Sequence, residues 1–529
     1  MRRTILPALI ALSCVALAGC KVTSEDIDNW TGTVKGPGKI VAVLLADKYE
    51  DELRAYAGIA LVKMEPREDV DGVAELQAAV RQLPEDVRPR LVDRMVPDLI
   101  GMMRGEDAPQ AAEEGETVPR RQVRAKDAAF LLVPYASDER RRELTDAVVD
   151  WFVVDFNGRS LEGNYSAEQV VRQLGAPAAS RLVSALNARL PQGALVKLSE
   201  LIASLGDRET KQRAAARLVE IEREMESAEF LDWLKERLRE QMRAQREGQE
   251  GQVDEARVAL AAGLNRENFI TLGALPAMKH LNDQRVVQDR LLEIARQAVD
   301  EPAIGARRIK ALQAMENGVR ADQVEALLDI ALDDPTARVP VAALGGGRPD
   351  DYAFDRIADA RATSAIPRLW PVFDATEDWR MRWRVGKLIL TLGGNEVVQQ
   401  FFEHLTDPEY AQEELHNYGE RISQMRPPPT DFINTQLRSA QWFDRAIALY
   451  FWEKRATAED IARITALEGD TARTAGANWR DQDTLGKVAA AVARTVRARL
   501  AQGEPAQGEP AAAPAEAPAN GGAAAGDAD

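Results

Sequence analysis

Apolar residues return at helical spacing along most of the 529-residue chain, and runs typical of strands are scarce. Four stretches share one order: an apolar run, an Asp that closes a helix, and an Arg early in the next helix, followed by small Ala residues that allow close packing. A looser fifth stretch follows the same order. The five pairs are Asp47 and Arg54, Asp207 and Arg213, Asp300 and Arg307, Asp333 and Arg338, and Asp374 and Arg380.

The distance between successive turns supports repeated helix pairs. Asp300, Asp333, Asp374 and Asp407 are 33, 41 and 33 residues apart, which suits two helices per repeat. We therefore predict an all-α fold, an α-solenoid of stacked antiparallel helix pairs.

This pattern resembles the HEAT repeat family and its shorter HEAT-like relatives. In that family a turn Asp and a following Arg form a ladder between stacked repeats, so the resemblance implies the same role for the five pairs above. The distance from Asp to Arg varies here, and Glu413 and Glu414 stand where an Arg would follow Asp407. The resemblance is patchy over residues 36–245 and clearer over residues 255–410.

The chain begins with a basic pair, Arg2 and Arg3, followed by an apolar run from Ile5 to Ala18. A bilayer core about 30 Å thick takes roughly 20 apolar residues to cross, so this run is too short to span it. A short apolar run behind a basic start is typical of a signal peptide.

The four residues that end at Cys20, LAGC, are similar to the lipobox of bacterial lipoproteins. In that family the Cys receives a diacylglycerol, the chain is cut before it, and the new amine is acylated. The resemblance implies that residues 1–19 are removed and that acyl chains such as palmitate on Cys20 anchor the protein to the membrane. Lys21 replaces the Asp of inner-membrane lipoproteins, which favours the periplasmic face of the outer membrane. The alternative is an ordinary cleaved signal with an incidental Cys.

Composition excludes several classes of function. A formal charge of −17 repels nucleic acid, so no nucleic-acid partner is expected. Cys14 lies in the removed segment, so the mature chain keeps one lipidated cysteine and forms no disulfide. A Cys nucleophile and a Cys-ligated zinc are thereby excluded.

Signatures of catalysis are missing from the sequence. It contains no phosphate-binding loop of the G-x-x-x-x-G-K-[ST] type and no G-x-S-x-G elbow. Glu413, His416 and His404 are the best candidates for metal ligands, but a histidine satisfied by its surroundings is the more common case. We therefore predict that the protein is not an enzyme and holds no cofactor or metal.

Breaks in the pattern divide the chain into segments. The polar run at 246–252 marks the predicted boundary between two repeat regions. A tail without apolar side chains larger than Ala is expected to be disordered. The predicted segments are the signal peptide 1–19, the lipidated tether 20–38, a first repeat region 39–245, a second repeat region 255–500 and the tail 501–529.

Two features interrupt the first repeat region. Residues 104–122 lack large apolar groups apart from Val118 and are expected to form a flexible loop. From Ile221 an apolar stripe continues towards Arg246, which predicts one long helix over residues 221–246. That helix would form a coiled-coil strut, an arm or, more commonly, a helix lying on its neighbours.

Aromatic residues concentrate between residues 370 and 452, which hold about half of the chain's total. Trp379 and Trp383 lie four residues apart and share a helix face, with Arg382 and Arg384 beside them. Because Trp and Arg are enriched in protein-binding hot spots, these four residues are the candidate protein-binding site. From sequence alone we favour a structural interpretation instead. In it the aromatic residues of this segment form a thick hydrophobic core, and Arg380 is the arginine of the ladder pair with Asp374.

These observations predict a membrane-anchored lipoprotein that acts as a non-catalytic protein-binding scaffold or adaptor in the bacterial envelope. A helical-repeat stack offers a long surface for binding, and the partner would be an unidentified envelope protein. Two alternatives are a passive structural protein of the envelope and, less favoured, a carboxylate-dependent hydrolase that pairs two acidic side chains in one cleft.

Overall fold

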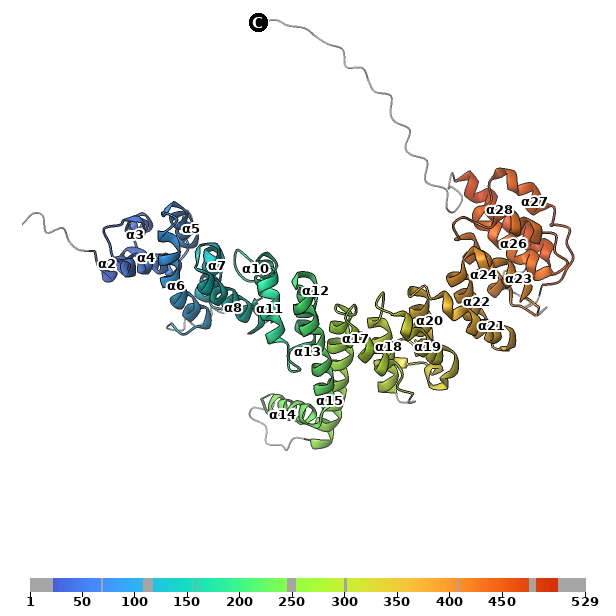
Figure 1. Cartoon of the computed structure of the whole chain (residues 1–529), viewed down its shortest axis with the longest axis horizontal. Helices are drawn as coiled ribbons and strands as arrows, with labels where there is room; N and C mark the ends of the chain where they lie inside the picture. Colours follow the sequence, from blue (N-terminus) through green and yellow to red (C-terminus); the bar gives the residue numbers. More distant parts are fainter. Residues whose placement is uncertain are drawn as a thin grey trace, which may run out of the picture. The chain divides into compact units, whose positions relative to one another are not determined.

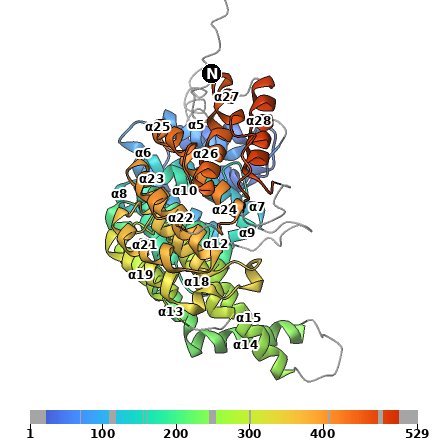
Figure 2. The same ribbon diagram turned by 90° about the vertical axis from the view of Figure 1, so that its right-hand side faces the viewer.

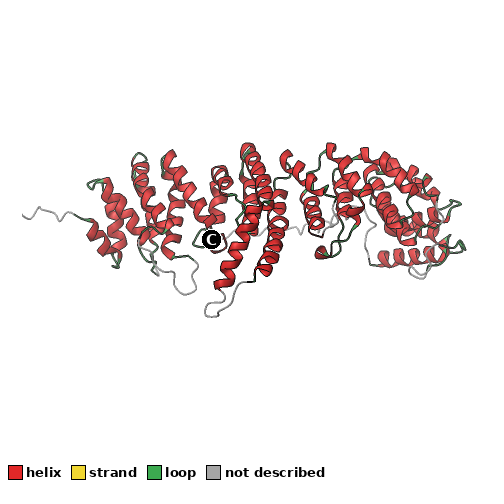
Figure 3. Cartoon of the chain, turned by 90° about the horizontal axis from the view of Figure 1, so that it is seen from below, coloured by secondary structure: helices red, strands yellow, loops and turns green. Residues whose placement is uncertain are grey.

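The computed structural model describes residues 22–67, 70–107, 118–154, 156–159, 161–244, 254–298, 302–406, 409–474 and 482–502. Cys20, the predicted signal peptide, Asp300, Asp407 and most of the predicted tail lie outside these residues. Within them the chain is helical, with isolated bridges and no strand (Figure 3). The prediction of an all-α, solenoid-like fold is confirmed.

The chain forms two compact units, Met1–Leu291 and Leu292–Asp529. The division falls inside a helix, α17 (Arg285–Ala295), and not in the polar run at 246–252 where the sequence placed it. The helices on either side of that run, α14 and α15, pack against each other. The run therefore lies within the first unit.

In the first unit, successive helices pack on their neighbours in chain order (Figure 1). Contacts join α3 with α4, α6 with α7, α11 with α12, and α14 with α15. The helices are α2 (Ser24–Thr31), α3 (Gly36–Leu45), α4 (Asp51–Lys63), α5 (Gly72–Gln82), α6 (Val87–Arg104), α7 (Arg120–Leu132), α8 (Asp138–Val154), α9 (Phe156–Arg159), α10 (Ala167–Leu174), α11 (Ala176–Ala185), α12 (Gln192–Leu205), α13 (Arg208–Glu226), α14 (Ala228–Ala244), α15 (Glu255–Asn268) and α16 (Leu275–Lys279).

Local sequence explains where these helices begin and end. Asp207 caps α13, since its carboxylate accepts a hydrogen bond from the Thr210 amide at 2.8 Å. Gly105 ends α6 in the left-handed conformation that glycine adopts without strain. Helix α7 already begins at Arg120, so the predicted loop 104–122 is shorter than expected, and residues 108–117 lie outside the described residues.

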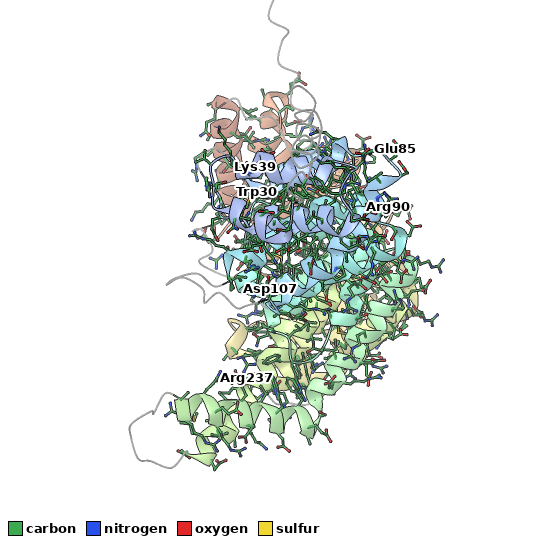
Figure 4. The ribbon with its side chains drawn as sticks, turned by 90° about the vertical axis from the view of Figure 1, so that its left-hand side faces the viewer. Trp30, Lys39, Glu85, Arg90, Asp107 and Arg237 are labelled. Atoms are coloured by element: carbon green, nitrogen blue, oxygen red, sulfur yellow. The ribbon has the colours of Figure 1, made fainter. Side chains whose placement is uncertain are left out.

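The first helix pair illustrates how surface side chains support the stack. The Lys39 ammonium of α3 lies 5.1 Å from the centre of the Trp30 ring of α2. Both residues are labelled in Figure 4. Such a cation over an aromatic face contributes about 0.5–1 kcal/mol at an exposed site.

The long helix predicted over residues 221–246 is in fact two helices. Helix α13 ends at Glu226, and Ser227 has extended backbone with ψ near 158°. The Ser227 hydroxyl accepts a hydrogen bond from the Phe230 amide and so starts α14. The apolar stripe continues across the break, which is why spacing alone suggested one helix.

Helix α14 turns away from the row of helix pairs and packs on α15 (Figures 1 and 2). Phe230 and Trp233 lie against Phe269, with ring centres 5.4 and 6.1 Å apart. Phe269 opens η2 (Phe269–Ala274), a π-helical stretch that continues α15. Arg237, labelled in Figure 4, lies over the Trp233 ring.

In the second unit, α21 packs on α22, α22 on α24, α24 on α26, and α26 on α28. Short 3₁₀ and π-helical turns connect several of the helices. The helices are α18 (Pro302–Ala314), α19 (Val324–Leu328), α20 (Pro349–Asp359), α21 (Ile366–Ala375), α22 (Trp379–Gly393), α23 (Asn395–Glu403), α24 (Gln412–Ser423), α25 (Thr430–Gln436), α26 (Trp442–Arg455), α27 (Ile461–Thr465) and α28 (Leu485–Ala501).

The core of the second unit is aromatic. The Phe401 ring lies 5.3 Å from Phe373 and 4.9 Å from Tyr418, centre to centre, and all three side chains are buried. The Phe401 and Tyr418 rings meet edge to face, and a pair of this kind adds about 0.5–1.5 kcal/mol beyond the area that it buries. The interpretation of the aromatic segment as core is therefore confirmed for most of its residues: Trp370, Phe373, Phe401, Phe402, Tyr410, Tyr418, Phe443, Tyr450, Phe451 and Trp452.

The predicted ladder of Asp and Arg pairs differs from what the structure shows. Arg54 donates to the Leu44 carbonyl at the end of α3 and pairs with Asp51, while Asp47 is exposed. Arg213 donates to the Ser180 hydroxyl. In both pairs the hydrogen bonds of the arginine go to a group other than the turn Asp, although hydrogen bonds from Thr210 and the charge of Arg213 lower the pKa of Asp207.

The pairs of the second unit have other partners as well. Asp333 is bound by Arg368, and Arg338 donates to the Leu332 carbonyl. Asp374 binds His404, whereas Arg380 is exposed. Arg307 is buried, and its expected partner lies outside the described residues.

One contact recurs at several arginines of the chain. Arginines bind backbone carbonyls at the end of a preceding helix, where four carbonyls lack partners within the helix and the helix dipole is negative. Arg88 donates to the Leu83 carbonyl at 2.8 Å, and Arg308 donates to the Ala295 carbonyl at 3.0 Å. Of the arginines that the sequence pattern marked, Arg54 and Arg338 make this kind of contact.

Within the described residues, no helix is both long and apolar enough to cross a membrane.

Candidate functional site

Helix α22 carries the Trp and Arg residues singled out in the sequence. Asp378 caps the helix by accepting a hydrogen bond from the Arg380 amide at 3.0 Å. The buried face of the helix includes Val385 and Ile389 and packs on α21 and α24. This packing fixes the direction in which the remaining side chains of α22 point.

Trp379 lies on the first turn of α22 and is 41 % exposed, in contrast to the buried aromatic residues of this unit. The Arg380 guanidinium lies 5.4 Å from the centre of its ring. The pair therefore presents an aromatic surface and a positive charge on a rigid helix, the combination that is enriched in protein-binding hot spots.

Trp383 lies one turn further along and lines a cleft between α20 and α22. The cleft has a volume of about 250 Å³ and is also lined by Phe354, Asp355, Lys387 and Leu388. The Trp383 indole nitrogen is buried and, among the described residues, has no hydrogen-bond acceptor. The cleft thus combines apolar walls with an indole N–H that has no acceptor in the described part of the protein.

Arg384 also lines this cleft but is held by acidic residues of α20. It forms ion pairs with Asp350, at 3.2 Å, and with Asp351. Asp350 is buried, and burial raises the pKa of its carboxyl group, whereas Arg348 and Arg384 lower it. Arg384 therefore shapes the wall of the cleft through contacts within the protein.

Arg382 does not belong to this surface. Its side chain is buried, its Nε lies 3.1 Å from Glu414 Oε1, and its guanidinium lies 4.5 Å from the centre of the Tyr410 ring. Tyr418 donates its hydroxyl proton to the same carboxylate at 2.8 Å, and burial raises the pKa of Tyr418 well above its usual value. Arg382 therefore lies in the core of the unit, because α24 covers its side chain.

The histidines considered as metal ligands have other partners. His404 stacks on Trp370 with ring centres 4.2 Å apart, and its Nδ1 lies 2.8 Å from Asp374. His416 lies 3.7 Å from Glu453. Among the residues that the structure describes, no group of three or more His, Cys, Asp or Glu side chains is placed to hold a metal ion.

Of the four predicted binding residues, the structure leaves Trp379 exposed, places Trp383 and Arg384 at one cleft, and buries Arg382. Sequence reasoning missed Phe354 and Lys387, which complete the cleft with Trp383. Lys387 lies one turn after Trp383, and this spacing signals a shared helix face. Phe354 comes from another helix, and nothing in the sequence linked it to α22.

No protein-family model and no curated protein matches this sequence.

Proposed function

We propose that this chain is a lipid-anchored, non-catalytic protein-binding scaffold or adaptor of the bacterial envelope. The LAGC sequence supports an anchor on Cys20, and Lys21 supports the outer rather than the inner membrane. Stacked helices present an extended surface of the kind that repeat proteins use for binding. The HEAT-like character of the repeats forms part of the same proposal.

The exposure of Trp379 is the observation that carries the binding role. Large aromatic side chains contribute strongly to binding when a partner covers them. Trp379 stands beside Arg380 on a capped helix, and Trp383 continues the same face into the cleft. A partner protein that covers this face would bury the Trp379 indole and pack against the walls of the cleft beside it.

The experiment is site-specific photo-crosslinking in intact cells. A photoreactive residue replaces Trp379 in one variant and the exposed Gln400 of α23 in a matched control. We expect one discrete crosslinked protein from position 379 and none from position 400. The same protein should no longer be co-purified from detergent extracts of the Trp379→Ala variant.

Two results would contradict the proposal. The absence of any product specific to position 379 would favour a passive structural role in the envelope. For the anchor, metabolic labelling with a palmitate analogue should mark the wild-type chain and not the Cys20→Ser variant, and an unlabelled wild-type chain would rule out lipidation.

A further inference from the structure

The first unit contains a groove that the sequence did not indicate. It runs between α8 and α11, which pack on each other. Two cavities, of about 590 and 570 Å³, lie along it and share Arg181 and Ser184 of α11. The residues with which helix α8 lines the groove include Arg142, Asp146, Asp150 and Val154, which are four residues apart and lie on one face of the helix.

An ion pair crosses the middle of this α8/α11 groove. The Arg181 Nη2 lies 2.7 and 2.8 Å from the two carboxylate oxygens of Asp150, and its Nε lies 2.9 Å from one of them. Both side chains remain more than one-third exposed. Arg181 can therefore donate to a second carboxylate that approaches from solvent.

One end of the groove is mainly apolar. Its lining includes Trp151 and Met103, each only 2 % exposed, and Val154, which is 72 % exposed. The indole nitrogen of Trp151 is buried without an acceptor among the described residues. An exposed valine beside a buried tryptophan gives an aliphatic side chain of a ligand a surface to cover.

The other end of the groove is basic. Arg142 is exposed and makes no hydrogen bond or ion pair within the described part of the chain. Arg213 of α13 reaches the same cavity and donates to the Ser180 hydroxyl at 2.8 Å. The charged lining residues of this cavity are Arg141, Arg142, Arg181, Arg213, Asp138 and Asp146.

This excess of arginine stands out in a chain with a formal charge of −17. Arginine recognises carboxylates through paired, charge-assisted hydrogen bonds. A positive groove on an otherwise acidic protein also draws acidic ligands towards itself.

The length of the groove points to a chain-like ligand. From Arg142 to Val154 a helix rises about 18 Å, at roughly 1.5 Å per residue. An extended peptide covers that distance with about five or six residues, at about 3.3 Å each.

We propose that the α8/α11 groove binds an extended acidic peptide segment of a partner protein. Carboxylates of the segment lie against Arg142 and Arg213, and an aliphatic side chain lies against the exposed Val154 at the apolar end. This goes beyond the function proposed above, because it assigns a second binding surface, in the other compact unit, together with the chemistry of its ligand.

The test uses the full chain in detergent and two dye-labelled hexapeptides. One contains three Glu residues followed by Gly and two Leu, and the other has Gln in place of each Glu. Fluorescence anisotropy should show the Glu peptide binding at least tenfold more tightly, with an affinity that falls as salt is added. Equal binding of both peptides, or binding of neither, would overturn the proposal.

Matched variants locate the peptide in the groove. Arg142→Gln and Arg213→Gln should each weaken binding at least fivefold. Arg140→Gln should change it less than twofold, because Arg140 lies on the same helix but pairs with Glu143 and does not line either cavity. Equal effects at Arg140 and Arg142 would show that peptide binding depends on the overall positive charge of this helix and not on the groove, and would contradict the proposal.

The apolar end has its own pair of variants. Val154→Asp should weaken binding at least fivefold, whereas Leu161→Asp should leave it unchanged, since Leu161 is 78 % exposed but does not line either cavity. If decanoate binds and the Glu peptide does not, the ligand of the groove is a small amphiphile and not a peptide, and the assignment is overturned. The Trp379→Ala variant should bind the peptide normally, so failure of this proposal is separate from failure of the previous one.

Discussion

Arg382 of α22 and Glu414 of α24 form an ion pair inside the second unit, with both carboxylate oxygens within 3.3 Å of the guanidinium group. The side chain of Glu414 is completely buried, and Tyr418 donates a further hydrogen bond to it. The pair joins two helices that pack on each other. A residue that the sequence suggested for binding thus holds the core of the unit together.

Removing one partner of this pair should destabilise the unit strongly. Arg382→Ala leaves the Glu414 carboxylate buried without its counter-charge, which costs about 3–5 kcal/mol. Urea unfolding followed by circular dichroism measures the loss. Arg380→Ala is the control, because its exposed side chain should change stability by less than about 0.5 kcal/mol. Equal losses from the two variants would contradict the assignment.

Two tryptophans of the aromatic segment should behave differently. Trp370 is 8 % exposed and stacks on His404, so Trp370→Ala should cost about 3–5 kcal/mol. Trp379 is 41 % exposed, and we expect Trp379→Ala to cost less than about 1 kcal/mol. Thermal unfolding of the two variants makes the comparison. A large loss at Trp379 would mean that its main role is structural.

The capping arginines should not tolerate lysine. Arg308 is fully buried and donates to the Ala295 carbonyl, to the Thr336 hydroxyl and to Asp334. Lysine lacks the planar fork that reaches these groups together, so Arg308→Lys should cost about 3 kcal/mol in chemical unfolding.

Arg296→Lys is the matched control for this variant, because Arg296 is exposed. It should be neutral within about 0.5 kcal/mol. A tolerated lysine at position 308 would show that the carbonyl contact adds little.

Asp444 should make stability depend on pH. Its side chain is buried, and burial raises the pKa of its carboxyl group, although hydrogen bonding from Ser439 and the charge of Arg445 lower it. The folded pKa therefore lies above the unfolded value of about 3.9. The protonated form stabilises the fold below that value, and this contribution is lost as pH rises through the folded pKa.

An amide at this position does not titrate, so the Asp444→Asn variant should gain stability relative to the wild type as pH rises from about 4 to about 7. The difference is measured by comparing the urea midpoints of unfolding of the variant and the wild type at several pH values. Asp431→Asn serves as the control, because Asp431 is exposed. A difference between Asp444→Asn and wild type that stays constant over this range would refute the pKa shift.

The sequence by itself determined the helical fold and the aromatic character of the second unit. Both depend on local information. Apolar spacing sets which residues are helical and which face of each helix is buried, and a run of large aromatic residues must be buried somewhere. The arginines that follow turns were also recognised, although the partner of Arg54 is the backbone carbonyl of Leu44 and that of Arg213 is the Ser180 hydroxyl.

Only the tertiary structure decided which side chains are exposed and which share a cleft. Arg382 and Arg384 are two residues apart, yet α24 covers the first and α20 binds the second. The break between α13 and α14 depends on the backbone conformation of one residue, Ser227. Asp150 and Arg181 come from different helices and meet across the α8/α11 groove. Such contacts join residues far apart in the chain, and spacing within one helix carries no information about the helix that packs against it.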